Sequence, residues 1–148
     1  MILRKYRPED GAETLKLFYD TVHSVCCKDY RKEQLDAWAE KDRDEEKWNQ
    51  SLLKNNCLIA EEDGKILGFA DMDENGYLDR LYVGKDCRRK GVATALCRAL
   101  EEMSGKSSFS VHASITARLF FEKMGYKTVK EQTVERKGVK MTNFIMKK

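Results

Sequence analysis

The sequence predicts an α/β fold in which a mixed, mostly antiparallel β-sheet carries helices on both faces. Segments of strand type alternate with segments whose apolar residues recur at helical spacing. The dipeptides Asp63-Gly64 and Asn75-Gly76 lie between apolar runs, a pattern typical of antiparallel hairpins. Residues 77–113 have the pattern strand, helix, strand, and such a unit joins two parallel strands through a right-handed crossover.

The N-terminal third predicts one strand and three helices. Residues 1–6 alternate as a strand does, and Pro8 ends the strand. Asp10 is placed to cap the first helix, a short second helix comes next, and the third helix follows Asp44. The apolar faces of these helices are, in chain order, Leu15, Phe18, Tyr19 and Val22; Leu35, Trp38 and Ala39; and Trp48, Leu52 and Leu53.

The rest of the chain predicts six strands and two helices. One helix covers residues 91–104, and a second carries an apolar face and is stopped by Gly125. The last two strands form a hairpin around Arg136-Lys137-Gly138. The six strands are residues 57–61, 65–70, 77–83, 107–113, 127–135 and 139–146, and the apolar face of the second helix is Ala117, Phe120, Phe121 and Met124.

Length and composition narrow the class of protein. A chain of 148 residues fits one domain, residues 1–148, that buries a real core. A net charge of +3, with basic and acidic residues interspersed, argues against a nucleic-acid partner. No apolar run approaches the roughly 20 residues that span a bilayer, and the N-terminus lacks the apolar region of a signal peptide. We therefore expect a cytoplasmic protein with no membrane partner.

The five cysteines predict neither disulfides nor a metal site. Their number is odd, no Cys-x-x-Cys occurs, and a secretion signal is missing. Cys26 and Cys27 are adjacent, and the chain has only two histidines to complete a ligand set. We expect reduced cysteines without metal.

The segment Arg88-Arg89-Lys90-Gly91-Val92-Ala93-Thr94 joins a predicted strand to a predicted helix. The first amides of a helix have no partner within it, and the helix dipole favours negative charge there. Gly91 lets a ligand approach the backbone because it has no Cβ. A Walker loop does not fit, because Arg89 occupies its second glycine position, and Gly91 lacks the companion glycines of a dinucleotide fingerprint. The segment predicts a site for a phosphorylated cofactor.

Two motifs in order point to a known family. Arg88, Gly91 and Ala93 fit Gln/Arg-x-x-Gly-x-Gly/Ala, and residues 117–126 read Ala-x-x-Phe-aromatic-Glu-Lys-x-Gly-aromatic. With the order of the predicted elements, nearly the whole chain resembles the GCN5-related N-acetyltransferase (GNAT) superfamily. The residues that resemble its bacterial YafP-like branch are His23, Tyr30 and Trp38, then 113–117 and 142–144.

The resemblance implies an N-acetyltransferase that uses acetyl-coenzyme A (acetyl-CoA) and transfers its acetyl group by direct attack of a primary amine on the thioester. It implies that residues 88–94 wrap the CoA pyrophosphate, that the strand at 81–83 contacts the pantetheine arm, and that a backbone N–H near Val83 serves the oxyanion. The expected cofactor-binding residues are Leu81, Tyr82, Val83, Arg88, Arg89, Lys90, Gly91, Val92, Ala93, Thr94, Ser114 and Phe121.

The reaction needs a proton acceptor. A lysine-like amine with a pKa of about 10.4 is neutral only about once in 10³ at pH 7, and a carboxylate or histidine relieves that cost. The candidates are Asp79, His112 and His23. Each has a structural alternative: an ion pair with Arg80 for Asp79, a surface or core position for His112, and a helix C-terminal cap for His23.

Tyr30 and Trp38 are candidates for the acceptor pocket, and core packing is their alternative. The chain departs from the family at two positions. Phe121 stands where many members carry a tyrosine that protonates the CoA thiolate, and Ser114 replaces a frequent asparagine. A thiol pKa near 8.5 makes the thiolate a fair leaving group without that help.

A small-molecule amine is the expected acceptor, since nothing in the sequence suggests a groove for a peptide or nucleic acid. Two other functions stay open: a non-catalytic acetyl-CoA-binding regulatory module, which Phe121 favours, and a protein lysine or N-terminal acetyltransferase. A homodimer is also left open.

Overall fold

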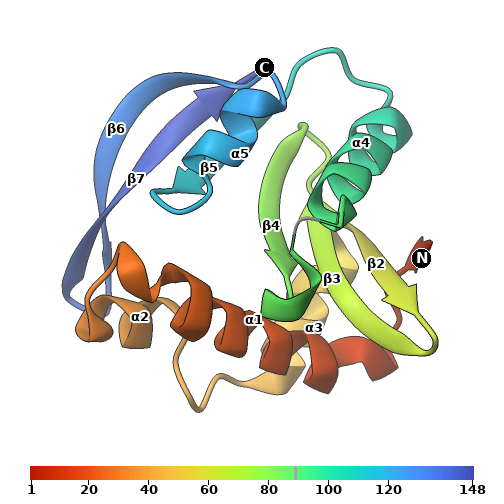
Figure 1. Ribbon diagram of the computed structural model, residues 1–148, viewed down its shortest axis with the longest axis horizontal. Coiled ribbons are helices and arrows are strands. Elements are labelled where there is room, and N and C mark those ends of the chain that lie inside the picture. The colour runs from red at the N-terminus through yellow and green to blue at the C-terminus, as the bar shows by residue number, and fades with distance from the viewer. Residues whose placement is uncertain (89) are drawn as a thin grey trace.

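The computed structural model describes residues 1–88 and 90–148, which form seven strands and five α-helices (Figure 1). In chain order these are β1 (Ile2–Lys5), α1 (Gly11–Val25), α2 (Lys32–Trp38), α3 (Glu45–Lys54), β2 (Asn56–Glu62), β3 (Lys65–Met72), β4 (Tyr77–Val83), α4 (Val92–Ser104), β5 (Ser110–Ser114), α5 (Arg118–Lys123), β6 (Lys127–Arg136) and β7 (Val139–Lys147). Three single turns of 3-10 helix cover Pro8–Asp10, Cys26–Lys28 and Lys85–Cys87.

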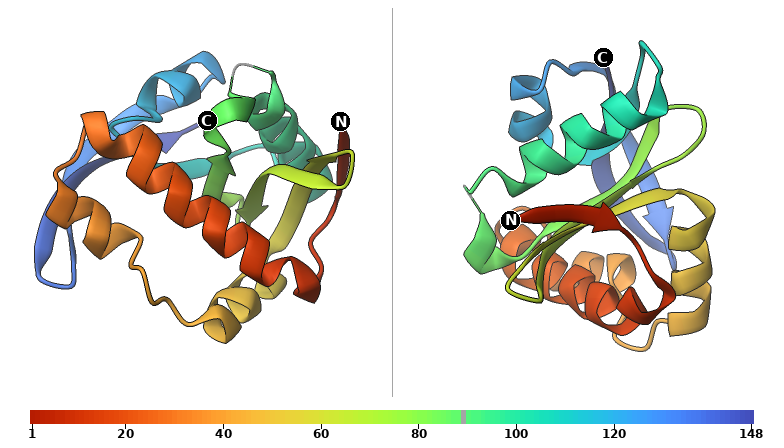
Figure 2. Two further views of the ribbon diagram at one scale, coloured as in Figure 1. Left: turned by 60° about the horizontal axis from the view of Figure 1, so that its bottom comes forward. Right: turned by 90° about the vertical axis from the view of Figure 1, so that its right-hand side faces the viewer.

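The strands form one sheet in the order β1-β2-β3-β4-β5-β7-β6. Neighbouring strands run antiparallel, except for the parallel pair β4 and β5, whose connection passes through α4. Helices α1, α2 and α3 cover one face of the sheet, and α4 and α5 cover the other, as both views of Figure 2 show. The predicted mixed sheet with helices on both faces is confirmed.

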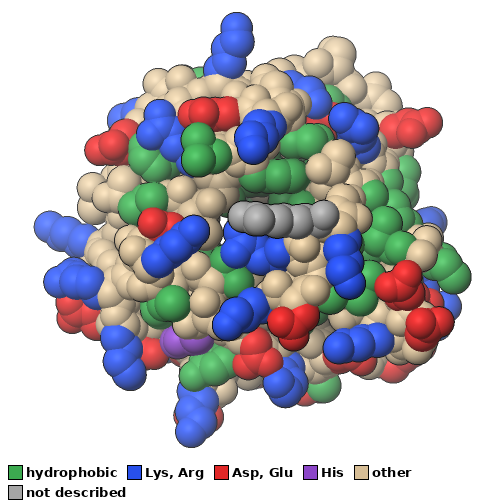
Figure 3. All heavy atoms as spheres, in the orientation of Figure 1, with side chains coloured by type: hydrophobic (Ala, Val, Ile, Leu, Met, Phe, Trp, Pro, Cys, Tyr) green, Lys and Arg blue, Asp and Glu red, His purple; other side chains and the backbone are tan. Residues whose placement is uncertain are grey.

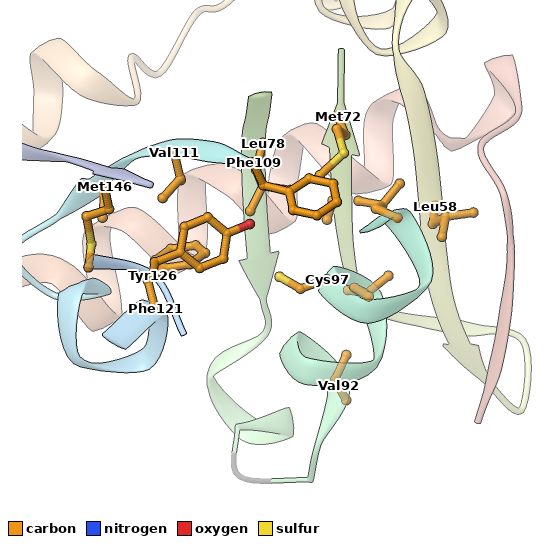
Figure 4. Close-up of a cluster of buried hydrophobic side chains, with 14 of the residues drawn as sticks. Leu58, Met72, Leu78, Val92, Cys97, Phe109, Val111, Phe121, Tyr126 and Met146 are labelled. Atoms are coloured by element: carbon orange, nitrogen blue, oxygen red, sulfur yellow. The ribbon is translucent and has the colours of Figure 1, made fainter. Parts of the chain in front are cut away.

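Alternation along the strands divides the core between the two faces. Leu58 and Ala60 of β2 join the cluster under α4 and α5, whereas Cys57 and Ile59 join the cluster under α1–α3. Figure 4 shows the first cluster, with Val92 and Cys97 of α4 among the side chains of the neighbouring strands. Since α4 is held by its apolar face, its first turn is fixed relative to β4.

Most local predictions are confirmed. Asp63 and Gly64 both have positive φ, +52° and +77°, as a tight hairpin turn requires. The Asp44 carboxylate caps α3 by accepting bonds from the N–H groups of Glu46 and Lys47.

Asp10 lies at the start of α1 as expected but does not cap it. Its carboxylate instead accepts two bonds of 2.9 Å from the Arg4 guanidinium and one of 2.8 Å from the N–H of Arg7. Asp10 is buried, and a fixed guanidinium is a stronger partner than the amides of the helix. The prediction of a side-chain cap was wrong here.

Two other expectations need correction. The strand predicted at 107–113 covers Ser110–Ser114. Phe109 still exchanges both backbone bonds with Lys148, and the register of β5 against β7 gives the residues before Phe109 no partner on β7. Leu53, placed on the apolar face of the third helix, is 48% exposed because Trp48 and Leu52 alone cover the sheet.

Candidate active site

The parallel strands β4 and β5 pair at only two positions and then separate. Tyr77 pairs with Ser110 and Leu78 with Val111. A β-bulge follows at once, because Asp71 of β3 faces Arg80 and Met72 faces Leu78, which leaves Asp79 as the extra residue. From Arg80 to Val83, β4 is paired with β3 but has no strand on its other side among the described residues. An extended ligand can add to such an open edge.

Helix α4 begins shortly after the open edge of β4 ends. Gly91 precedes it with φ of +77°, and a Cβ there would meet no atom within 4 Å, so space lies beside this backbone. In the described part of the chain no side chain caps this helix, and its first turn holds no acidic residue. By contrast, α3 has Asp44 as its cap. The amides that start α4 are therefore available to an anion.

The side chains in the loop before α4 and in its first turn differ in how far they are buried. Arg88 and Lys90 are exposed, whereas Val92 is 2% exposed and belongs to the core, so only its backbone faces a ligand. Ala93 and Thr94 are half-buried. Arg89, also expected at the cofactor, lies outside the described residues.

The expected pantetheine strand alternates between the two faces. Leu81 and Val83 pack against the cluster under α4, and Tyr82 packs against the cluster under α1–α3. Their backbones lie at the open edge of β4. Phe121 is 3% exposed and packs edge-on against Phe120 and Tyr126, with ring centroids 5.1 and 5.3 Å apart.

A cavity of about 740 Å³ opens between the separated strands on the side of α1–α3. It brings together Asp79 and Tyr82 from β4, and His112 and Ser114 from β5. Aromatic rings form much of its wall. The lining residues are Phe18, Tyr30, Trp38, Glu40, Asp42, Arg43, Asp44, Lys47, Trp48, Ser51, Tyr77, Asp79, Arg80, Tyr82, His112, Ser114, Val134, Arg136, Met141, Thr142 and Asn143.

Asp79 sits beside a buried ion pair. Arg80 holds Asp71 through Nε at 3.1 and 3.2 Å and through Nη2 at 2.7 Å, and it also donates to the Ser51 hydroxyl at 2.8 Å. Asp71 is fully buried and accepts a further bond from Asn55. Burial raises the pKa of the Asp71 carboxyl against the opposing effect of Arg80. The exposed Asp79 carboxylate receives only long contacts of 3.4 Å from Arg80 and Asn55, so it remains free for a ligand.

His112 and Ser114 lie on the same wall of the cavity, as strand alternation indicates, while Ala113 between them is buried. His112 is exposed and meets the Tyr77 ring edge-on at 5.1 Å. Its ring nitrogens make no hydrogen bond within the described residues. Ser114 Oγ accepts a bond from the N–H of Ala117 and thereby fixes the turn into α5.

Tyr30 and Trp38 line the cavity but also serve the fold. The Tyr30 hydroxyl donates to the Thr142 carbonyl at 2.8 Å and accepts from the Ile115 N–H at 2.9 Å, which ties the segment before α2 to β7 and to the end of β5. Burial raises the pKa of Tyr30. Trp38 packs edge-on against Tyr30 at 5.5 Å. Both the pocket and the core alternatives therefore describe these residues.

His23 is not among the residues that line the cavity. Its Nε2 lies 2.8 Å from the Ala39 carbonyl, its Nδ1 is 3.9 Å from Asp36, and its ring stacks on Tyr19. These contacts join the end of α1 to the end of α2, so His23 shapes the cavity from outside.

Sequence reasoning missed the three arginines of the cavity, Arg43, Arg80 and Arg136. Arg80 was weighed only as a partner of Asp79, although its main partner, Asp71, is a charged residue inside an otherwise apolar strand, which is a usable signal for a buried pair. Arg136 was assigned only to a turn, and nothing local in the sequence indicates that it lines a cavity.

The remaining surface carries mixed charge. On the face seen in Figure 3, basic and acidic side chains are interspersed. Within residues 1–88 and 90–148, no helix is long and apolar enough to cross a bilayer, and no three His, Cys, Asp or Glu side chains are grouped to hold a metal ion. All five cysteines are free thiols.

Comparisons with known proteins agree with this arrangement. The acetyltransferase (GNAT) domain family matches residues 26–148. The uncharacterized N-acetyltransferase YafP of Escherichia coli is 37% identical over 145 residues, which are 98% of this chain and 93% of that protein.

Two solved structures share the fold. A GCN5-related N-acetyltransferase from Rhodopseudomonas palustris superposes with a TM-score of 0.95 at 36% identity, covering 99% of this chain and 94% of that one. The PaiA N-acetyltransferase of Thermoplasma acidophilum, solved in complex with coenzyme A, gives a TM-score of 0.81 at 18% identity, covering 99% and 97%.

Proposed function

Because this chain belongs to the GNAT family of N-acetyltransferases, we propose that it transfers the acetyl group of acetyl-CoA to a primary amine of a small molecule. One observation carries the proposal: β4, whose edge beyond Leu78 is open, leads to the free first turn of α4 and also lines a cavity that contains Asp79 and His112. The cofactor supplies a thioester, whose carbonyl carbon gains the amine nitrogen as its bond to sulfur breaks.

The start of α4 would hold the CoA pyrophosphate. Its free amides and the exposed Arg88 and Lys90 offer hydrogen bonds and positive charge, and Gly91 leaves the backbone open. Hydrogen bonds to charged groups contribute about 1.5–3 kcal/mol each, so several amides outweigh the dipole's 0.3–1 kcal/mol. The pantetheine arm would lie along the open edge of β4 at Leu81–Val83.

Asp79 would bind the amine, and His112 would accept its proton. The Asp79 carboxylate is exposed and only weakly bonded, so it attracts the incoming ammonium group. His112 takes the proton, since its ring nitrogens are unoccupied by the described residues and a neutral imidazole is a good base near neutral pH. The thiolate would leave without a tyrosine, because Phe121 has no hydroxyl and the Tyr126 hydroxyl is bonded to Glu101.

The experiment is an acetylation assay with a panel of amines, read as released CoA thiol and as acetylated product by mass spectrometry. Asp79→Asn should raise KM for the amine, and His112→Gln should lower kcat about 10²-fold or more. Unchanged rates in both variants would remove these two assignments.

Tight cofactor binding without turnover would favour a regulatory module, and acetylated lysines or N-termini in co-expressed proteins would favour a protein acceptor. A cytoplasmic location is part of the proposal, in keeping with the five free thiols.

A further inference from the structure

Three arginines line the cavity, and within the described residues one of them, Arg136, has no protein partner. Arg136 lines it from the end of β6, on the same strand face as Val134. Within residues 1–88 and 90–148, Arg136 makes no ion pair and no side-chain hydrogen bond. The other two arginines of the cavity differ: Arg80 is paired with Asp71, and Arg43 donates to the Trp38 carbonyl and lies near Glu40.

Arg136 is exposed and lines the cavity together with three tyrosines from other elements. Tyr77 and Tyr82 stand on β4, and Tyr30 precedes α2. Its positive charge opposes the rise in pKa that burial imposes on each of these tyrosines, so a ligand bound in the cavity can reach a guanidinium at its exposed edge.

Four acids line the cavity with Arg136, and none of them forms an ion pair with it within the described residues. Glu40 binds Lys137, at the adjoining turn, and lies near Arg43. Asp44 caps α3, and Asp79 receives only long contacts of 3.4 Å from Arg80 and Asn55. Asp42, on the segment between α2 and α3, and Lys47, on α3, also line the cavity.

Resting on the proposed function, we propose that the acceptor carries an anionic group, a carboxylate or a phosphate, as well as its amine, and that Arg136 binds that group. Asp79 and His112 would then receive the amine end in the same cavity. A guanidinium binds either anion through two parallel N–H bonds and thereby fixes the orientation of the acceptor. Arg136 would be a specificity-determining residue, since it discriminates against amines that lack the anion.

The test compares amines that differ only in the anionic group: phenylalanine, its amide and its phosphonate analogue, followed by alanine and its amide. For each, kcat/KM is measured in the wild type, in Arg136→Gln and in Arg136→Lys. The ratio of kcat/KM for the acid to kcat/KM for the amide is taken in the wild type and divided by the same ratio in the variant. This division cancels the different intrinsic reactivities of the amines. Lys130→Gln removes one positive charge from an exposed position of the same strand and is the matched control.

We expect Arg136→Gln to lower kcat/KM for the anionic member by about 10- to 100-fold, mainly through KM, and to change the amide less than twofold. The kcat/KM of Arg136→Lys for the anionic member should fall between those of the wild type and Arg136→Gln, and the kcat/KM of Lys130→Gln should match that of the wild type. A preference for phosphonate over carboxylate would identify which anion the site takes, and either preference supports the proposal. An equal loss of kcat/KM for the acid and the amide in Arg136→Gln would overturn the proposal.

Calorimetry with the CoA-bound protein separates this inference from the function it rests on. Binding of the anionic amines that depends on Arg136, without acetyl transfer, would uphold the anion site and contradict the transferase. Acetylation of neutral amines alone would uphold the transferase and contradict the anion site. Absence of both binding and transfer for every anionic amine would overturn the inference.

Discussion

The ion pair between Arg80 and Asp71 should be one of the largest single contributions to the stability of this protein. Asp71 is 0% exposed, and its carboxylate accepts four hydrogen bonds. Three come from Arg80 and the fourth comes from Asn55. Arg80→Met would keep much of the side-chain volume but leave a buried carboxylate with one amide partner. Removing one member of a buried pair costs about 3–5 kcal/mol, against a total stability of about 5–15 kcal/mol for a domain.

The assay is urea unfolding followed by circular dichroism, because Trp48 lies under Arg80 at 5.3 Å and its fluorescence would report the substitution itself. The double variant Asp71→Asn with Arg80→Met should recover at least half of the loss, since no charge stays buried. Arg98→Met, at an exposed position of α4, is the control and should change the unfolding free energy by less than about 0.5 kcal/mol.

The pH dependence of the Arg80→Met loss has a definite sign. Without Arg80, the folded-state pKa of Asp71 is raised further by burial, above an unfolded value of about 3.9. The loss is therefore full above the raised folded-state pKa of Asp71 in the variant and shrinks as the pH falls through that pKa, because the protonated carboxyl is easier to bury. A loss below 1 kcal/mol at pH 7, or a double variant as unstable as the sum of its single variants, would refute this reasoning.

Three further predictions concern the start of α1, the start of α4 and the segment before α2. Burial opposes ionisation of Asp10, but its hydrogen bonds from Arg4 outweigh burial and lower its pKa. Asp10→Asn should therefore be less stable than the wild type at pH 7, and the two stabilities should converge as acid protonates Asp10 in the wild type. Parallel curves of stability against pH from 7 to 2 would contradict this. Gly91→Ala should weaken CoA binding, measured by calorimetry, at least about tenfold. Its control is Gly105→Ala at the other end of α4, where φ is +67° and a Cβ also has free space; both variants should lose about 1–2 kcal/mol of stability through backbone strain, but only Gly91→Ala should bind CoA more weakly. Equal CoA affinities of the two variants would be the contrary result. Tyr30→Phe should cost about 1–3 kcal/mol in urea unfolding by leaving two backbone groups unpaired, and Tyr19→Phe, whose ring stacks on a histidine, should cost less.

The sequence predicted those parts of the molecule that short stretches of chain determine. The turns at Asp63-Gly64 and Asn75-Gly76, the helix after Asp44 and the helix after Gly91 depend on residues within a few positions of one another. The family resemblance also rested on contiguous motifs, and the GNAT assignment is confirmed.

The acceptor side of the site was less accessible to sequence reasoning because distant segments build it. Whether Asp10 caps α1 depends on Arg4 in another element, and the partner of Arg80 depends on a bulge that no local pattern marks. Arg136 reaches the cavity only because β6 pairs with β7 in one register. Such contacts follow from tertiary structure, so residue type and spacing alone do not fix them.

The central claim is that this chain moves an acetyl group from acetyl-CoA to an amine. The most direct measurement incubates the purified protein with acetyl-CoA and the amine panel and counts released thiol against acetylated product in the same sample. The account predicts equal amounts of both, at a rate that falls about 10²-fold in His112→Gln. Cofactor binding with no acetylated product from any amine in the panel would contradict it.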